Sequence, residues 1–339
     1  MTLIAAYEPF GVPVLIGDFL ITGGQLSSTR KKIYKVSSNF VIGWTGNVID
    51  ARPLMKLIFE KFENETVSLR EVEKFLTSRT ADPNYTESLH LVGWIIEDDN
   101  RHCFLWNIAY PDELFFERYH TAGTGGETFK ALITRDTLGI TFHPQSRTNT
   151  ERAIRTVLSK AAELYADEML DKINRKKFFG HGYELLYFDG SEFRYLENIA
   201  FSGLDAAFDS EGKIIYRRPY DLWYRYHSLG DAAFLQINDF KTGDIILESI
   251  EPVFRKKMRD AAFEFTAGSL RANYYCLYFR FQNKSGKESY TGSYILPETP
   301  AGPSRYEKVV DGKWAFVIEN DVISDIYRQI KVGSKKPLK

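Results

Sequence analysis

The alternation of apolar and polar residues divides the first 200 residues into short strands and longer amphipathic helices. Apolar runs bounded by turn residues predict β-strands, and apolar residues spaced three and four apart predict helices packed on a sheet. The predicted helices cover residues 47–64, 68–79, 127–138 and 148–173. The predicted strands cover residues 3–7, 12–16, 33–36, 89–96, 102–108, 113–120, 183–189 and 193–199, with one more from residue 40 into a glycine turn.

Residues 201–339 contain a second set of strand and helix patterns, and this length suits a separately packed core. We therefore expect an α+β domain of unknown role after residue 200. Its tyrosine-rich stretch at residues 216–226 is typical of a half-buried strand, and a ligand or protein surface is the alternative. The predicted strands cover residues 212–219, 231–237, 274–282, 289–296 and 314–318, and the predicted helices cover residues 252–265 and 322–330.

The chain begins with Met1 and Thr2. Threonine is small enough for methionine aminopeptidase to remove a preceding methionine. Thr2 would then carry a free α-amino group, which titrates near pH 8 and can act as the base for its own hydroxyl. Many proteins also begin with Met-Thr before an apolar strand, so the dipeptide alone does not establish a nucleophile.

The spacing of charged residues after Thr2 strengthens this interpretation. The first two predicted strands form a hairpin, which brings Asp18 back beside Thr2, and a basic segment with Lys32 follows. A lysine lowers the cost of forming an alkoxide, and an aspartate keeps that lysine charged. The glycine turn at Gly46 lets backbone N–H groups approach a substrate carbonyl.

These residues also fall into a recurring pattern. Thr2 is followed 16 positions later by Asp18, which opens the sequence Asp18-x-x-x-Thr22-x-Gly24. Lys32 is followed by an apolar strand. Gly46 closes a Gly-Trp-Thr-Gly turn, and Thr124 lies in a Thr-Ala-Gly-Thr-Gly-Gly turn before a predicted helix.

Over residues 2–200 this order and spacing resembles the proteasome β-subunit and bacterial proteasome-like peptidase family of N-terminal nucleophile hydrolases. The resemblance implies a four-layer αββα sandwich for residues 1–200, and the predicted order of strands and helices agrees with it. It further implies that Thr2 is the nucleophile, that Asp18 and Lys32 support it, that the Gly46 amide stabilises an oxyanion, and that Thr124 supplies a hydroxyl near the terminal amine. Peptide-bond hydrolysis is the first expectation, and hydrolysis of another amide is the second.

The resemblance also implies a substrate-binding site. Trp44 would crowd its pocket, and Arg30 would favour acidic or polar groups. The remaining residues of this predicted pocket are Ile21, Thr22 and Val48.

One segment departs from the family pattern. Residues 177–182 read Lys-Phe-Phe-Gly-His-Gly, without the aspartate and serine of the family's Asp-x-x-Ser-Gly-Gly segment. His181 is a candidate substitute base, but a lone histidine between two glycines is more typical of a turn or of packing. The departure leaves open a second function, in which the chain is a catalytically silent proteasome-like scaffold or binding protein.

Composition narrows the remaining possibilities. The chain has 339 residues, 44% of them hydrophobic and 26% charged, with a formal net charge of -1, which is typical of a soluble globular protein and gives no drive toward nucleic acid. No apolar run predicts a membrane span or a secretory signal, and two cysteines do not form a disulfide framework. We expect a cytoplasmic protein without cofactor or metal. The resemblance implies a homo-oligomer, as a ring in many family members, with an ATP-driven unfoldase as a possible partner.

Overall fold

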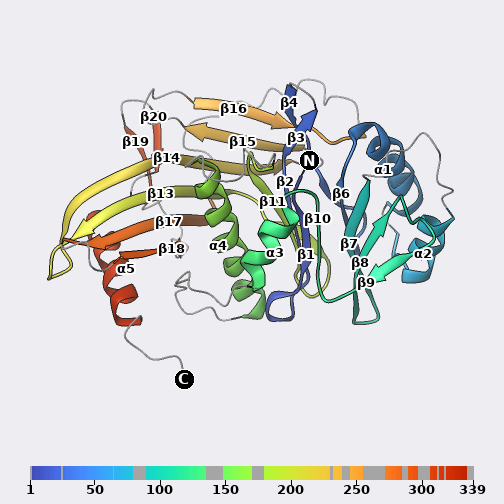
Figure 1. Cartoon of the computed structure of the whole chain (residues 1–339), viewed down its shortest axis with the longest axis horizontal. Coiled ribbons are helices and arrows are strands. Elements are labelled where there is room, and N and C mark those ends of the chain that lie inside the picture. The colour runs from blue at the N-terminus through green and yellow to red at the C-terminus, as the bar shows by residue number, and fades with distance from the viewer. Residues whose placement is uncertain are drawn as a thin grey trace.

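The computed structural model (Figure 1) shows a mixed α+β protein with several antiparallel sheets and, within the described residues, five α-helices. The α+β class predicted from the sequence is confirmed at this level. The structure describes residues 2–23, 26–63, 65–78, 89–134, 148–169, 179–229, 232–238, 245–254, 272–284, 289–296, 306–310, 313–316 and 318–333.

The first sheet has five antiparallel strands and begins with the hairpin predicted at the start of the chain. The order across this sheet is β10-β1-β2-β11-β12, so β1 and β2 lie near its centre. Its strands are β1 (Ile4–Tyr7), β2 (Val14–Asp18), β10 (His120–Ala122), β11 (Tyr183–Phe188) and β12 (Phe193–Tyr195).

The second sheet also has five antiparallel strands, in the sequential order β5-β6-β7-β8-β9. Its strands are β5 (Ile33–Lys35), β6 (Phe40–Thr45), β7 (His90–Glu97), β8 (Asn100–Asn107) and β9 (Leu114–Phe116). The single strand predicted over residues 113–120 is wrong. The chain leaves β9 at the exposed residues Glu117 and Arg118 and enters β10 of the first sheet.

These two sheets pack face to face. Their side chains alternate along each strand, so every second residue points into the layer between the sheets. Glycines allow the close approach, because a Cβ at Gly17 would lie 2.7 Å from Ile33, and one at Gly43 would lie 2.7 Å from Ile4. The fully buried residues of this layer include Ile4, Ala6, Leu15, Ile33, Val41, Val92 and Trp94.

Two helices cover the outer face of the second sheet. α1 (Val48–Phe62) begins at the N-cap Asn47, and α2 (Leu69–Thr77) begins with the predicted capping box of Ser68 and Glu71. Their apolar faces form one core with the second sheet. The helices predicted over residues 47–64 and 68–79 are confirmed.

Two further helices cover the outer face of the first sheet. These helices are α3 (Gly126–Thr134) and α4 (Asn149–Met169). α3 begins at the predicted glycine turn. α4 packs on β11, and its wide apolar face belongs to one core with residues of β1 and β2. The predicted ends of these helices, at residues 138 and 173, lie outside the described residues.

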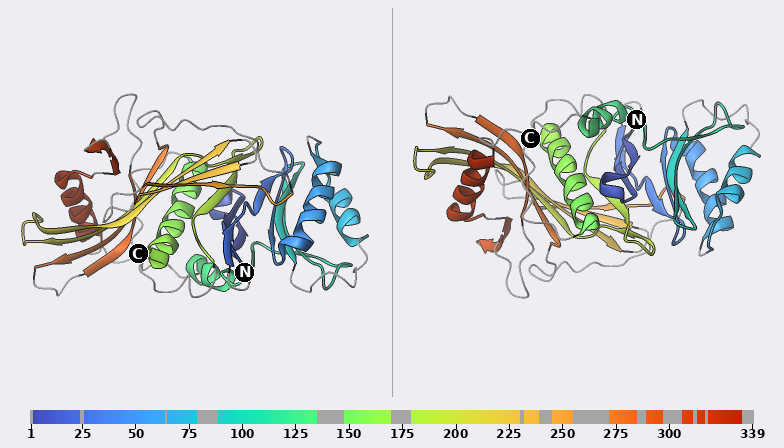
Figure 2. Two further views of the ribbon diagram at one scale, coloured as in Figure 1. Left: turned by 90° about the horizontal axis from the view of Figure 1, so that it is seen from above. Right: turned by 90° about the horizontal axis from the view of Figure 1, so that it is seen from below.

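A third sheet lies on the other side of α4 (Figure 2). Its six strands have the order β16-β15-β14-β13-β17-β18, and only the pairing of β13 with β17 is parallel. The hairpin predicted between residues 274–282 and 289–296 is confirmed. The strands are β13 (Ile199–Phe208), β14 (Ile214–Leu229), β15 (Ala232–Asn238), β16 (Ile245–Ile250), β17 (Tyr274–Asn283) and β18 (Ser289–Leu296).

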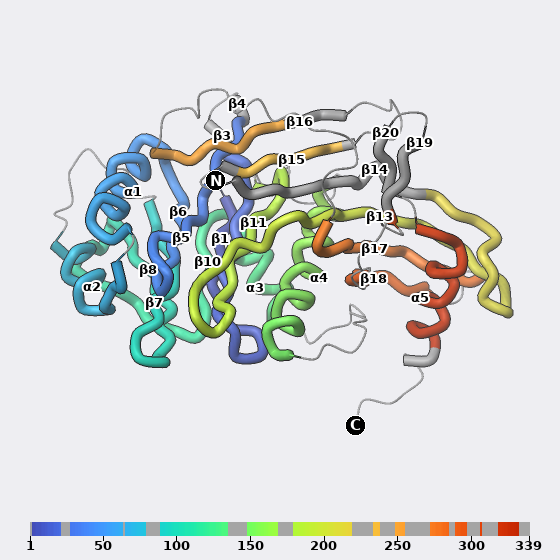
Figure 3. Tube along the Cα trace, turned by 180° about the vertical axis from the view of Figure 1, so that it is seen from behind, coloured from blue at the N-terminus to red at the C-terminus, as the bar shows by residue number. Residues whose placement is uncertain are grey.

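α5 (Asn320–Gly333) covers the outer face of the third sheet, at the opposite end of the molecule from α1 and α2 (Figure 3). This helix confirms the one predicted over residues 322–330. Two small hairpins complete the described chain, β3 (Leu20–Gly23) with β4 (Leu26–Thr29), and β19 (Glu307–Val310) with β20 (Lys313–Phe316). The helix predicted over residues 252–265 lies largely outside the described residues, and residues 252–254 are not helical.

The third sheet shares its core with the first part of the chain. Leu158 of α4 and Phe201 of β13 belong to one buried cluster, together with Leu235 and Cys276 from further along the chain. β13 also crosses residue 200, where the sequence predicts a domain boundary. α4 is therefore buried between two sheets, and its position is fixed from both sides.

A buried ion pair joins the first two sheets. Lys31, which precedes β5, lies with its Nζ 2.7 Å from Oε1 of Glu184 on β11, and both side chains are at most 1% exposed. The same Nζ lies 3.9 Å from the centre of the Tyr195 ring. Removing one partner of such a pair leaves a buried charge without compensation.

We expect Lys31→Met to lower the free energy of unfolding by about 3–5 kcal/mol, because the Glu184 carboxylate loses its counter-charge. The double variant Lys31→Met/Glu184→Leu should recover most of that loss. Urea denaturation measures both. The partly exposed pair of Lys35 and Glu192 is the control, since Lys35→Met should cost at most about 1 kcal/mol. A single variant as stable as the wild type would contradict this expectation.

Candidate active site

The hairpin of β1 and β2 brings Thr2 and Asp18 together, as the sequence predicts. Ile4 pairs with Gly17, and the Asp18 N–H donates to the Leu3 carbonyl at 3.1 Å. The last residue of β2 therefore lies beside the start of β1. Lys32 reaches the same point from the segment before β5.

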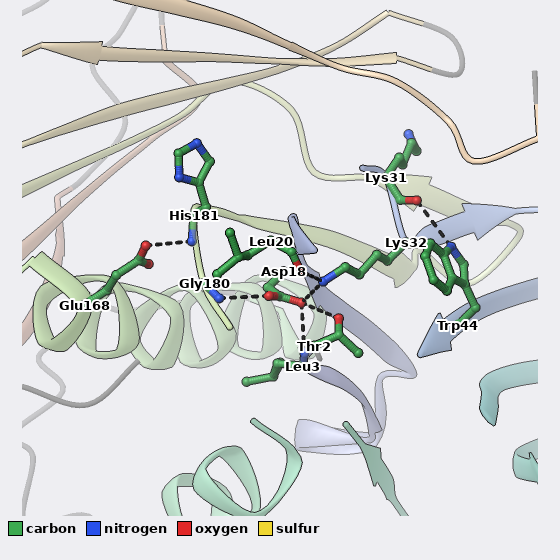
Figure 4. Close-up of polar contacts among 10 residues, drawn as sticks. All are labelled: Thr2, Leu3, Asp18, Leu20, Lys31, Lys32, Trp44, Glu168, Gly180 and His181. Carbon is green, nitrogen blue, oxygen red and sulfur yellow. Dashed lines mark hydrogen bonds and ion pairs between the residues drawn. The ribbon is translucent and has the colours of Figure 1, made fainter. Parts of the chain in front are cut away.

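The Asp18 carboxylate is the centre of this cluster (Figure 4). Its Oδ1 accepts hydrogen bonds from the Thr2 hydroxyl at 2.6 Å, the Leu3 N–H at 2.8 Å and Lys32 Nζ at 2.7 Å. Its Oδ2 accepts one from the Gly180 N–H at 2.8 Å. Charge-assisted hydrogen bonds of this kind are short and strong, so the carboxylate orients both the hydroxyl and the ammonium group.

Burial determines the electrostatics of the cluster. Thr2 is 2% exposed, and Asp18 and Lys32 are each 1% exposed. Burial lowers the pKa of Lys32, while the charge of Asp18 and its hydrogen bond oppose that shift. Lys32 Nζ also donates to the Leu20 carbonyl. The lysine is thus held by two oxygen acceptors within the cluster that contains the Thr2 hydroxyl.

The glycine turn before α3 packs directly on Thr2. The Gly125 N–H donates to the Thr2 carbonyl at 3.0 Å. Gly123 has φ +81°, and a Cβ there would overlap the Thr2 carbonyl oxygen, so glycine is required. Thr124, the predicted partner of the terminal amine, lies in this turn with an exposed side chain. Thr124 thus lies between Gly123 and Gly125, which both lie against Thr2, and its exposed side chain is not part of the buried cluster.

Gly46, the predicted oxyanion donor, lies between β6 and α1 and has φ +113°. The strand that precedes it is hydrogen-bonded to the segment that carries Lys32, since the Trp44 N–H donates to the Lys32 carbonyl at 3.1 Å. The N-cap Asn47 follows it and starts α1. Gly46 thus lies between β6, which is hydrogen-bonded to Lys32, and α1.

The predicted pocket residues lie around the core of α1 and the second sheet. Trp44 is 1% exposed and belongs to this core, with its Nε1 3.3 Å from the Lys31 carbonyl. Ile21 and Val48 are half-buried and pack against the same core. Arg30 is half-buried and donates to the Thr29 carbonyl at 2.9 Å. The backbone of the remaining predicted residue, Thr22, lies in β3, but its side chain is outside the described residues.

Gly180 belongs to the site through its N–H, although no sequence motif predicts it. The Gly-His-Gly sequence of residues 180–182 was the only signal available, and it indicates a turn. All three residues have positive φ, at +121°, +61° and +93°. The His181 ring points away from Thr2 (Figure 4), and its Nε2 lies 2.6 Å from Oε2 of Glu248 on β16. The backbone of this turn, rather than the histidine ring, serves the site.

The described chain contains cavities away from this cluster. Two cavities of about 580 Å³ each lie elsewhere, one beside Lys35 and Tyr195 and the other beside Tyr7 and Phe10. Thr2 is 2% exposed, so its hydroxyl must become more exposed before a substrate can contact it.

The described part of the chain offers neither a metal cluster nor a membrane-spanning helix. No three His, Cys, Asp or Glu side chains there are grouped closely enough to hold a metal ion. Nor does any helix in those ranges have the length and apolar character needed to cross a bilayer.

Comparison with known proteins gives no assignment. The sequence matches no protein-family model, and no curated protein matches it significantly. Functional conclusions therefore depend on the geometry of the site and on the resemblance of its motifs.

Replacing Asp18 by asparagine should lower the pKa of Lys32 further, because the charge that opposes desolvation is removed. NMR titration of the lysine Nζ and Cε signals measures this. By linkage, Lys32 contributes most to stability above its ordinary pKa of 10.5, and the contribution is lost as pH falls through the lowered folded pKa. The control Asp189→Asn changes a carboxylate remote from the site and should leave the Lys32 pKa unchanged. An unchanged pKa in Asp18→Asn would contradict the described cluster.

Proposed function

We propose that the chain is a threonine-type N-terminal nucleophile hydrolase that acts after removal of Met1. One observation carries this proposal: the Thr2 hydroxyl, the Leu3 N–H and Lys32 Nζ converge on a single oxygen of the buried Asp18. A threonine in this position, with a lysine and an aspartate, has every group that the chemistry requires once its amine is free.

The proposed reaction starts with attack of Thr2 Oγ1 on an amide carbonyl carbon. The Thr2 α-amino group, directly or through a water, takes the hydroxyl proton and then transfers it to the departing amine as the C–N bond breaks. Lys32 stabilises the developing charge on Oγ1, and the Gly46 N–H donates to the oxyanion. Water then attacks the resulting ester, which releases the acid and restores the hydroxyl.

The arrangement of layers supports the same proposal. α1 and α2, the second sheet, the first sheet, and α3 with α4 follow one another in space. This is the order of a four-layer αββα sandwich, with Thr2 at the end of a central strand of one sheet. We propose this sandwich as the fold of residues 1–200. We take peptides as the first substrate class and other amides as the second, as the resemblance implies.

A catalytically silent scaffold is the second candidate function. The observation that favours it is the burial of Thr2, which is 2% exposed. In a chain that keeps Met1, the Thr2 nitrogen would be part of a peptide bond and could not act as the base, and the buried Thr2 hydroxyl would serve only to hold Asp18. Whether the purified chain retains Met1 therefore distinguishes the two candidate functions.

Intact-mass analysis of the purified protein, before and after treatment with a peptide epoxyketone, tests the proposal. We expect a chain without Met1 that gains one adduct, because the epoxyketone reacts with a nucleophile that has a free neighbouring amine. Thr2→Ala should gain none. The control Thr134→Ala removes an exposed threonine of α3 and should react like the wild type. Retention of Met1 with no adduct would favour the scaffold instead.

A further inference from the structure

The position of Asp18 depends on a segment far away in the sequence. The Gly180 N–H donates to Asp18 Oδ2 at 2.8 Å, and the Gly180 carbonyl accepts from the N–H groups of Phe19 and Leu20 at 3.3 and 3.1 Å. The Leu20 carbonyl is in turn the second acceptor for Lys32 Nζ. One residue of the 180–182 turn therefore fixes both oxygen acceptors of the lysine.

The backbone conformation of this turn carries an energetic cost. Its three residues have positive φ, and the middle one, His181, is not a glycine. Left-handed backbone at a non-glycine residue costs roughly 1–2 kcal/mol. The surroundings must therefore hold the turn in place.

Glu168 of α4 holds the 180–182 turn in place. Its carboxylate is buried, with the residue 3% exposed, and its Oε1 accepts the His181 N–H at 2.7 Å (Figure 4). The carboxylate also lies directly against Gly180, since a Cβ there would overlap Glu168 Oε2. The His181 N–H thus donates to Glu168, and the N–H of the preceding residue, Gly180, donates to Asp18.

We propose that Glu168 is a positioning residue for the nucleophile, acting through the 180–182 turn; this inference rests on the proposed function. α4 is packed between the first and third sheets, so its carboxylate is a fixed point. The Glu168 carboxylate holds the His181 N–H through a hydrogen bond. The Gly180 N–H is thereby aimed at Asp18, and Asp18 aims Thr2 and Lys32.

This assignment also bears on the departure from the family pattern. Residues 177–182 lack the aspartate and serine that the resemblance implies. Glu168 approaches the same turn from the preceding helix instead. A loosened turn would allow Asp18 to shift, and misplacement of about 1 Å at a reacting group can cost as much as about 10²-fold in rate.

Kinetics of peptide epoxyketone labelling of the full chain test the inference. The maximal labelling rate and the half-saturating concentration are measured for the wild type, Glu168→Ala and Glu168→Gln. We expect Glu168→Ala to lower the maximal rate at least about tenfold with little change in half-saturation, since the turn positions the nucleophile and does not bind the probe. Glu168→Gln keeps an oxygen acceptor and should recover most of the rate.

Matched controls separate positioning from folding. Glu163→Ala removes another carboxylate of α4, one that lies 3.7 Å from Lys160, and should label like the wild type. If Glu168→Ala does not fold, Glu168→Asp decides, because the shorter side chain keeps the charge and loses the reach. A wild-type labelling rate in folded Glu168→Ala or Glu168→Asp would overturn the positioning role alone. Absence of labelling in the wild type would overturn the proposed function and this inference together.

Discussion

The buried carboxylate of Asp18 is the constraint on which the rest of the site depends. A buried charge is costly unless it is paired and hydrogen-bonded. Asp18 meets that requirement with four donors from three separate segments, which contain Thr2 and Leu3, Lys32, and Gly180. None of these segments can move without leaving part of the carboxylate unpaired. The same contacts that stabilise the charge therefore set the geometry of the candidate nucleophile.

The architecture supplies these segments from different layers. Thr2 and Asp18 come from the first sheet, and Lys32 comes from the edge of the second sheet. The turn with Gly180 leads into β11 and is held by α4, which the third sheet covers on its other side. The residues after 200 thus support the site indirectly, because they bury the helix that carries Glu168.

The sequence predicted the parts of this arrangement that depend on local rules. Hairpin geometry placed Asp18 beside Thr2, and apolar periodicity located α1, α2 and the hairpin of β17 and β18. It could not show that Trp44 belongs to the core, since an apolar residue suits a pocket or a core equally well. It also missed Gly180 and Glu168, because backbone donors and contacts between distant segments leave no periodic signal. The break between β9 and β10 was missed because polar residues inside a strand-like run do not reveal a change of sheet.

A crystal structure of the protein after reaction with a peptide epoxyketone tests the central claim most directly. The account predicts a chain that begins at Thr2, with both the α-amino nitrogen and Oγ1 bonded to the inhibitor, and with Asp18 still bonded to Lys32 and to the Gly180 N–H. A structure that retains Met1, with an unmodified Thr2 hydroxyl donating to Asp18, would contradict it.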